Sequence, residues 1–513
     1  MTNNNNKANV KKLSVIGVLL IIFPVVFGFN NSAVAFYRMG YASIVWYLIG
    51  ALTFFLPLML IIAEYAFSFK DAEGGIQTWM SKSKGDYFGF VVTFVFYFAQ
   101  LFWMVNFSTT RIWIPLSYGV FGRDITNSLN IFGLGSTQTI GICSIMFIVL
   151  ITFIITRDFS KFSKIAKIGG VACMSINIIL FTSAILIALL KLIKGAPIFV
   201  EPINGLKTFL IPTNESLNTP ISIFSFMSFA TFAYAGSETI GSLASKTRTK
   251  KTFSTGILYA TIVIAIGYSS AIFLWGFVQN SQTLNQNEHI NLGNILYQLM
   301  NSLGIELGKL IGIESSINYY FIGPIFARAT GIALLLTTIG AFLAVMYAPL
   351  QAIIKGAPEN LFPKFLNKKN KFNANHYAMW LQAVIVCSII GIISFGGKSA
   401  KTFYDLIVLM ANVAQTCPYI FIFFAFPAFR NKPELDHSFT IFKSKFSIYA
   451  TSIAGLFTVL IANILTILEP TLNGKTSDGL TKTIFMAVGP ILFILMGALI
   501  YKNYEKKLIK CKN

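Results

Sequence analysis

The chain has 513 residues, of which 55% are hydrophobic and 12% are charged, and its net charge is +21. A soluble protein carries about twice that charged fraction, whereas each transmembrane helix needs about 20 mostly apolar residues. The composition excludes a soluble enzyme, a disordered protein and a secreted domain. It predicts an all-α integral membrane protein.

Twelve apolar runs are long enough to be membrane spans, and they follow a polar N-terminal tail at 1–12. The longest loop, 280–325, is expected outside, and Ile295, Leu296, Leu299, Met300 and Leu303 give part of it helical spacing. That helix would either cover an external vestibule or lie on the membrane. The expected spans are 13–37, 41–66, 87–119, 138–156, 165–193, 220–244, 254–279, 326–352, 376–395, 402–429, 446–468 and 483–501.

Lysine and arginine orient the expected spans. Most of the 40 basic residues fall in the segments that are inside when both termini are cytoplasmic, and the basic tail at 502–513 is one of these segments. Basic residues accumulate on the cytoplasmic side of membrane proteins, so the positive charge needs no nucleic-acid partner. Only Arg111 and Arg328 fall within spans.

Signals for enzymatic chemistry are weak. The three histidines lie in or beside different loops, and the five cysteines contain no CxxC pair, so neither a metal site nor a cofactor is expected. Gly391 to Ser399 resembles a phosphate-binding loop, but its first glycine is one position too early. The sequence therefore does not predict an enzyme.

Two spans are interrupted by polar residues in mid-membrane. The first span continues after Phe27 as Gly28-Phe29-Asn30-Asn31, and the sixth reads Phe232-Ala233-Tyr234-Ala235-Gly236-Ser237-Glu238. Irregular backbone at that depth is tolerated where it lines a cavity or is packed in protein, and paired interruptions are typical of transporter binding sites. The alternative for the first span is a kink whose asparagines bond to a neighbouring helix.

Three acidic residues, Glu64, Glu238 and Asp405, lie within expected spans. A charge in lipid is costly, so each should face the interior of the helical bundle. Glu238 follows the second interruption and is the best functional candidate. Glu64 is equally consistent with an ion pair, and Asp405 is expected at the N-terminus of the tenth helix.

At these residues the chain resembles the amino acid–polyamine–organocation (APC) transporter superfamily, especially the bacterial glutamate/γ-aminobutyrate antiporters. The resemblance covers essentially the whole chain. The matching segments are Ala63-Glu64-Tyr65, Gly74-Gly75-Ile76 before Trp79, Lys164 to Gly170, and Tyr234 to Glu238.

The resemblance implies a leucine-transporter-type fold, with two inverted five-helix repeats and two further helices. These would be repeats at 13–193 and 220–430, an external loop at 194–219, and helices 11 and 12 at 431–501. The substrate's amine and carboxylate would meet the two interruptions. The implied substrate-binding residues are Phe27, Gly28, Phe29, Asn30, Asn31, Phe232, Tyr234, Ala235, Gly236 and Ser237.

The resemblance also implies gating and coupling roles. Phe232 matches an aromatic residue that closes over the substrate, and Glu238 matches an acid of gating or proton response. Lys167 falls where some relatives place a lysine that takes the role of a sodium ion. Packing for Phe232 and an ordinary cytoplasmic charge for Lys167 remain open alternatives.

Departures from the family pattern bear on the substrate. Glutamate-exchanging relatives can carry a positive charge near the first interruption, and this sequence has none beside Gly28, which disfavours an acidic substrate. A cationic amino acid that pairs with Glu238 is an alternative. Thr337 and Thr338 would provide hydroxyls to a sodium ion, although threonines that pack helices are more common.

The sequence thus predicts a secondary active amino acid transporter of a bacterial inner membrane, which works by exchange or proton symport. Its partners are the amino acid, the lipid bilayer and protons as the candidate coupling ion. An integral-membrane enzyme and a channel are the alternatives from other classes.

Overall fold

The structure is a computed structural model of the whole chain. It describes residues 14–69, 75–131, 133–157, 162–214, 217–236, 247, 249–358, 360–372, 374–396, 400–437, 439–473 and 477–512. Helices make up most of this part of the chain, and within it no β-strand forms beyond one isolated bridge between Ile131 and Leu134. An all-helical fold agrees with the composition.

The first half of the chain forms helices of very different lengths. They are α1 (Val15–Val26), α2 (Phe29–Met39), α3 (Ala42–Gly50), the π-helix η1 (Ala51–Phe55), α4 (Leu56–Ser68), α5 (Ile76–Lys84), α6 (Asp86–Thr109), α7 (Trp113–Phe121), the short η2 (Thr126–Ser128), α8 (Ser136–Ile155), α9 (Phe162–Ile193) and α10 (Lys207–Leu210).

The second half continues in the same way. Its helices are α11 (Pro220–Ala233), α12 (Lys250–Trp275), α13 (Ser281–Gln286), α14 (Ile295–Leu310), α15 (Ser315–Ile317), the π-helix η5 (Asn318–Ile322), α16 (Gly323–Gly356), α17 (Lys364–Asn367), α18 (His376–Ser394), α19 (Ala400–Arg430), α20 (Lys445–Asn473) and α21 (Ser477–Lys512).

Ten helical segments of the described chain are long and apolar enough to cross a membrane. The other two expected spans are the interrupted ones. The first is divided into α1 and α2, and α11 of the sixth ends after 14 residues. The multi-pass membrane architecture is therefore present, while the count of twelve spans and the inverted repeat stay predictions.

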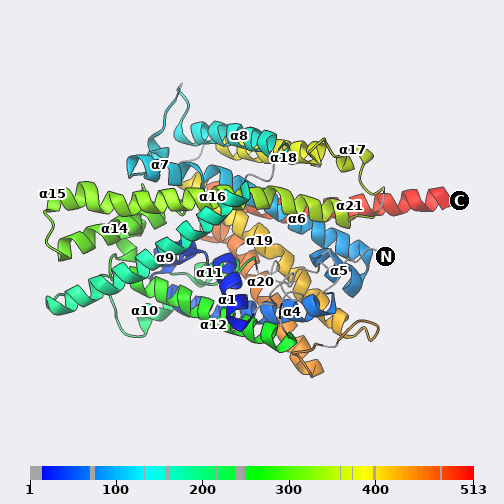
Figure 1. Cartoon of the computed structure of the whole chain (residues 1–513), viewed down its shortest axis with the longest axis horizontal. Coiled ribbons are helices and arrows are strands. Elements are labelled where there is room, and N and C mark those ends of the chain that lie inside the picture. The colour runs from blue at the N-terminus through cyan, green and yellow to red at the C-terminus, as the bar shows by residue number, and fades with distance from the viewer. Residues whose placement is uncertain are drawn as a thin grey trace, which may run out of the picture.

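The helices pack around two apolar clusters. One cluster joins residues of α1 to α4 with residues of α11 and α12, and the other joins α6, α7 and α8 with α16 and α18. Figure 1 shows α8 and α18 along one side of the molecule, and α1, α4 and α12 along the opposite side. The molecule therefore has two packed bodies, to which α19 contributes residues on both sides.

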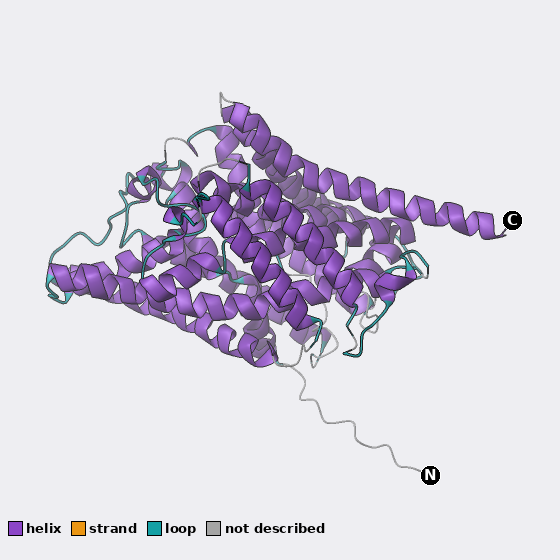
Figure 2. Cartoon of the chain, turned by 90° about the horizontal axis from the view of Figure 1, so that it is seen from above, coloured by secondary structure: helices purple, strands orange, loops and turns teal. Residues whose placement is uncertain are grey.

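The ends of the helices define two faces of the molecule. In Figure 1, α5, α17 and the end of α21 lie at one end, and α14 and α15 lie at the other. We call them the α17 face and the α14 face. Figure 2 shows α21 extending beyond the bundle, because the segment expected as a basic tail at 502–513 is helical up to Lys512.

The long loop contains the helix that its spacing predicts. Ile295, Leu296, Leu299, Met300 and Leu303 lie on α14 and are fully buried. Because α14 packs against α16 and α9, it covers the bundle rather than lying on the membrane. The third expected span is also divided, since α6 ends at Thr109 and α7 begins at Trp113.

Candidate functional site

The first interruption is a short extended stretch between two helices. Phe27 and Gly28 have extended backbones, with φ of −75° and −90°, and α2 begins at Phe29. A Cβ atom at Gly28 would lie 2.7 Å from the Asn31 side-chain nitrogen, so close packing rather than backbone conformation favours glycine here. The Asn31 N–H donates to the Gly28 carbonyl at 2.8 Å, whereas the Phe29 and Asn30 N–H groups open the helix and have no partner within it. The predicted interruption is confirmed.

The second interruption follows α11, which ends at Ala233. Gly236 has φ of +96°, a conformation that side chains other than glycine rarely adopt. The Gly236 N–H donates a hydrogen bond of 2.9 Å to the Tyr419 hydroxyl on α19. The helix thus ends as expected, but Ser237 and Glu238 lie outside the described residues, so their predicted roles remain predictions.

One tyrosine on α12 contacts both interruptions. The Tyr268 hydroxyl accepts from the Gly28 N–H at 2.7 Å, and it lies 3.0 Å from the Val26 carbonyl oxygen and 2.9 Å from that of Ala233. A phenol has one proton, so it donates to one of these two carbonyls at a time. Asn31 also donates to this hydroxyl, at 3.3 Å, as the alternative for the first interruption anticipated.

A cavity of about 370 Å³ lies beside both interruptions, within the range of about 300–1,000 Å³ that is common for small-molecule sites. We call it the large compartment. Eight residues that the resemblance assigns to substrate binding line it: Phe27, Gly28, Phe29, Asn30, Asn31, Phe232, Ala235 and Gly236. Residues from the two interruptions, which are far apart in the sequence, therefore line one cavity in the folded chain.

Tyr234 is placed differently from the other candidates. It is fully buried outside the lining of the large compartment, where its ring stacks on Phe55 at 4.4 Å and its hydroxyl donates to the Tyr47 carbonyl at 3.1 Å. These contacts are those of a residue that packs α11 against α3 and η1. Its predicted contact with substrate stays a prediction.

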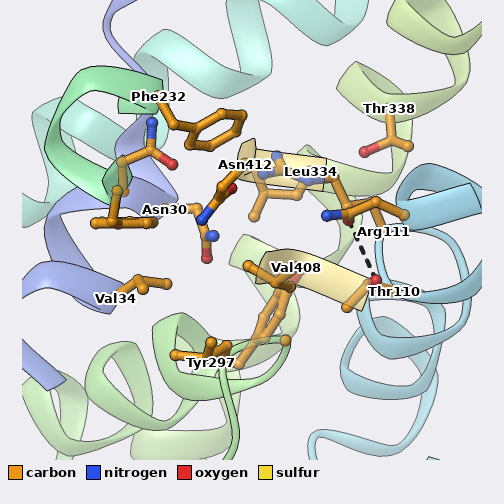
Figure 3. A pocket seen from close by; sticks show the side chains of 15 residues that line it. Asn30, Val34, Thr110, Arg111, Phe232, Tyr297, Leu334, Thr338, Val408 and Asn412 are labelled. Atoms are coloured by element: carbon orange, nitrogen blue, oxygen red, sulfur yellow. Dashed lines mark hydrogen bonds between the residues drawn. The ribbon is translucent and has the colours of Figure 1, made fainter. Parts of the chain in front are cut away.

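A second cavity, of about 40 Å³, adjoins the first. We call it the small compartment. Asn30, Asn31, Arg111, Phe232, Leu334 and Thr338 line both compartments. In Figure 3, Asn412 lies between Asn30 and Arg111, with Phe232 above them. Phe232, whose ring meets Trp103 edge-on at 5.3 Å, therefore lies where the two compartments adjoin.

Arg111 corrects the expectation that no positive charge lies near the first interruption. It sits between α6 and α7, lines both compartments with Asn30, and has its guanidinium carbon 5.0 Å from the centre of the Trp103 ring. No carboxylate in the described part of the chain forms an ion pair with it. The sequence did place this arginine within a span, which is itself a functional signal, but spacing along the chain cannot show that it meets Asn30.

Asn412 on α19 was not predicted at all. It is 1% exposed, and neither atom of its side-chain amide has a hydrogen-bond partner among the described residues. Buried amides are nearly always hydrogen-bonded. The available signal was a polar asparagine within an apolar span. In the structure Asn412 lies in the wall of the small compartment.

The two compartments extend toward opposite faces. The large one continues past Arg111 to Gln100 on α6, and past Thr338 to Val345 on α16. Since α6 starts next to α5, and α16 leads into α17, this direction is toward the α17 face. The small one is bounded by Leu292 and Gly293 from the loop before α14, so it lies toward the α14 face.

The described acids of the spans have structural partners. Glu64 pairs with Arg430 at 3.4 Å and accepts from the Phe442 N–H at 2.9 Å, which fits the ion-pair alternative. Asp405 lies inside α19 and not at its N-terminus, because that helix already begins at Ala400. Its carboxylate accepts from the Leu292 N–H at 3.0 Å and so ties the loop before α14 to α19.

Both threonines considered for ion coupling line the large compartment, but the Thr337 hydroxyl also joins two helices. The Thr337 hydroxyl lies 2.7 Å from the Gly169 carbonyl and 2.8 Å from that of Ala333, contacts that join α16 to α9. Thr338 lines both compartments. Lys167 lies on α9, but its side chain is outside the described part of the structure.

Comparison with known proteins gives one family over nearly the whole chain. The model of the family described as "Amino acid permease" matches residues 13–494. The inner membrane transporter YjeM of Salmonella typhimurium is 40% identical over 97% of this chain and 97% of its own length.

More distant relatives have names that state a substrate. The aspartate/glutamate permease AcaP of Lactococcus lactis subsp. cremoris is 22% identical over 82% of this chain and 80% of its own length. A glutamate/γ-aminobutyrate antiporter of Lactococcus lactis subsp. lactis is 23% identical over 90% of this chain and 84% of its own length. The region that the family model matches, residues 13–494, includes both interruptions.

Proposed function

The chain belongs to the amino acid permease family, and we propose that it is a secondary active amino acid transporter that works by alternating access. Membership of a family of permeases makes the chain a transporter and not an enzyme. The observation that carries the proposal is that two helix interruptions, 208 residues apart between Gly28 and Gly236, border one cavity.

The backbone at the interruptions suits a zwitterion. The N–H groups of Phe29 and Asn30 open α2, where the helix dipole favours a carboxylate. Carbonyl groups at the ends of α1 and α11 suit an ammonium group, because the single proton of the Tyr268 hydroxyl serves only one of the Val26 and Ala233 carbonyls at a time. The amino acid's common groups are therefore bound by backbone, which leaves side chains of the cavity to select among amino acids.

The two packed bodies suit alternating access. The large compartment extends toward the α17 face, while Leu292 and Gly293 line the small one on the side of the α14 face. Rocking of the α1–α4, α11 and α12 body against the α6–α8, α16 and α18 body would exchange the open face. The present arrangement is then the one open toward the α17 face.

The location and orientation follow from relatives and charge. The relative most similar in length and sequence among those above is an inner membrane transporter, which supports a bacterial inner membrane for this chain. The accumulation of lysine and arginine in the segments at 364–371 and 502–512 supports a cytoplasmic α17 face. Both termini are then cytoplasmic, and the present arrangement faces inward.

The coupling reaction we favour is exchange or proton symport. Thr337 lines the large compartment, but its hydroxyl is already engaged with the Gly169 carbonyl and joins α16 to α9, which supports packing over a role in sodium binding. Lys167 and Glu238 remain the residues proposed for proton response. A cationic amino acid is disfavoured, because Arg111 would repel a positively charged side chain in either compartment.

Uptake into proteoliposomes tests the proposal. The purified protein would be offered each of the twenty amino acids, with and without the same amino acid inside, and with and without an inward proton gradient. We expect uptake of one or a few amino acids, stimulated by internal substrate for exchange or by the gradient for symport. Absence of uptake of every amino acid in all four conditions would contradict the function.

A further inference from the structure

The small compartment holds two polar groups that the described protein leaves without ordinary partners. Arg111 has only the faces of Trp103 and Phe107, with ring centres 5.0 Å and 5.6 Å from its guanidinium carbon. Asn412, which is 1% exposed, has no hydrogen bond at either amide atom within the described residues. Both line the same cavity of about 40 Å³.

Such a pair is costly in an empty protein. Arg111 is half-buried, and a cation removed even partly from water is ordinarily paired with an anion, because aromatic faces compensate only part of its lost hydration. An amide without hydrogen bonds loses those it made to water. Because both groups lie in one compartment beside the proposed substrate cavity, a bound ligand is the partner that satisfies both at once.

The chemistry of the two groups specifies the ligand group. A planar guanidinium matches a carboxylate through two parallel hydrogen bonds, and the Asn412 amide can donate to the same anion. The volume of about 40 Å³ holds roughly two or three water molecules. A group as small as one carboxylate therefore suits this volume.

We infer that the transported amino acid carries a second, side-chain carboxylate, which Arg111 and Asn412 receive in the small compartment. This inference rests on the proposed function, in which the backbone of the two interruptions binds the amine and the first carboxylate. Phe232, where the compartments adjoin, then lies over the aliphatic part of the bound molecule. The substrate class is an acidic amino acid with a short aliphatic side chain.

The test compares L-glutamate with L-glutamine, which has the same shape without the second charge, in the purified full-length protein in proteoliposomes. Initial uptake rates and inhibition constants would be measured for the parent, Arg111→Gln, Arg111→Lys and Asn412→Ala. Arg328→Gln is the matched control, because Arg328 also lies within an expected span but is exposed. The retained charge of Arg111→Lys provides a conservative rescue.

We expect the parent to favour L-glutamate over L-glutamine by at least about tenfold, which corresponds to about 1.4 kcal/mol. Arg111→Gln should abolish that preference while L-glutamine binding persists, Asn412→Ala should reduce it, and Arg111→Lys should restore part of it. Arg328→Gln should match the parent.

Equal use of the two amino acids by the parent would overturn the inference, even if no variant folds. Equal loss of L-glutamate and L-glutamine binding in Arg111→Gln would also overturn it, because Arg111 would then hold the carboxylate common to both. In either case uptake of neutral amino acids would leave the proposed function intact. Absence of uptake of every amino acid would overturn both.

Discussion

The two helix interruptions depend on glycine for different reasons. Gly28 has a φ of −90°, which any residue adopts, but a side chain there would meet Asn31 at 2.7 Å beside the cavity. Gly236 has a φ of +96°, which only glycine adopts readily. The first glycine is thus favoured by the space that the Asn31 side chain occupies, and the second by the path of the backbone.

The largest effect is expected from Gly28→Val. The added side chain would displace the Asn31 amide, which lines both compartments, so transport should fall by roughly a hundredfold or more, as a small misplacement at a site can cause. Thermal stability should change little, because the backbone conformation is ordinary.

A valine at Gly391 on α18 is the control for that experiment, since a Cβ there meets no atom within 4 Å. Uptake and the thermal midpoint would be measured for both variants. If Gly28→Val transports like Gly391→Val, the first interruption is only a kink, and the proposal that it forms part of the substrate site is wrong.

Gly236→Ala should lower thermal stability more, and transport less, than Gly28→Val does. An alanine held at positive φ costs about 1–3 kcal/mol, so the variant should unfold at a lower temperature than the parent, and transport by the surviving folded protein should fall less than in Gly28→Val. Thermal unfolding in detergent, followed by uptake per folded molecule, measures both. An unchanged midpoint would argue against the left-handed backbone at Gly236.

A smaller effect on substrate affinity is expected from removing the hydroxyl of Tyr268 or of Tyr419. The Tyr268 hydroxyl contacts both interruptions, whereas the Tyr419 hydroxyl accepts from Gly236 at the second. Removing one hydroxyl loses a hydrogen bond worth about 0.5–1.5 kcal/mol, so each loss should be a few-fold to about tenfold. Tyr268→Phe should lower substrate affinity more than Tyr419→Phe, and the reverse order in a binding titration would refute the link between the interruptions.

The sequence predicted features that depend on local chemistry. Gly28 and the polar residues after it interrupt an apolar run, so the end of α1 and the start of α2 were foreseeable. The spacing of Ile295 to Leu303 likewise predicted α14. In each case the signal and the structure it specifies occupy the same few residues.

The features that were missed depend on contacts between distant segments. Arg111 lies 81 residues after Asn30, and Asn412 lies 382 residues after it, yet all three line the small compartment. Neither the separation of residues along the chain nor hydrophobic periodicity predicts that these three side chains lie around one cavity. The absence of a basic residue beside Gly28 therefore misled the expectation about substrate charge, because the cation comes from another helix pair.

Alternating access between the two compartments is the central claim, and substrate-dependent thiol labelling tests it most directly. Val345, in the large compartment, and Val408, in the small one, would each be changed to cysteine in a chain without its five native cysteines. Vesicles of both orientations would be treated with a bulky thiol reagent that does not cross membranes, with and without the transported amino acid.

Without substrate, the account predicts labelling of Val345→Cys from the α17 face and no labelling of Val408→Cys from either face. With saturating substrate, labelling at Val345→Cys should fall, and Val408→Cys should become reactive from the α14 face. Labelling of both positions from both faces at once, or labelling that substrate does not change, would contradict alternating access.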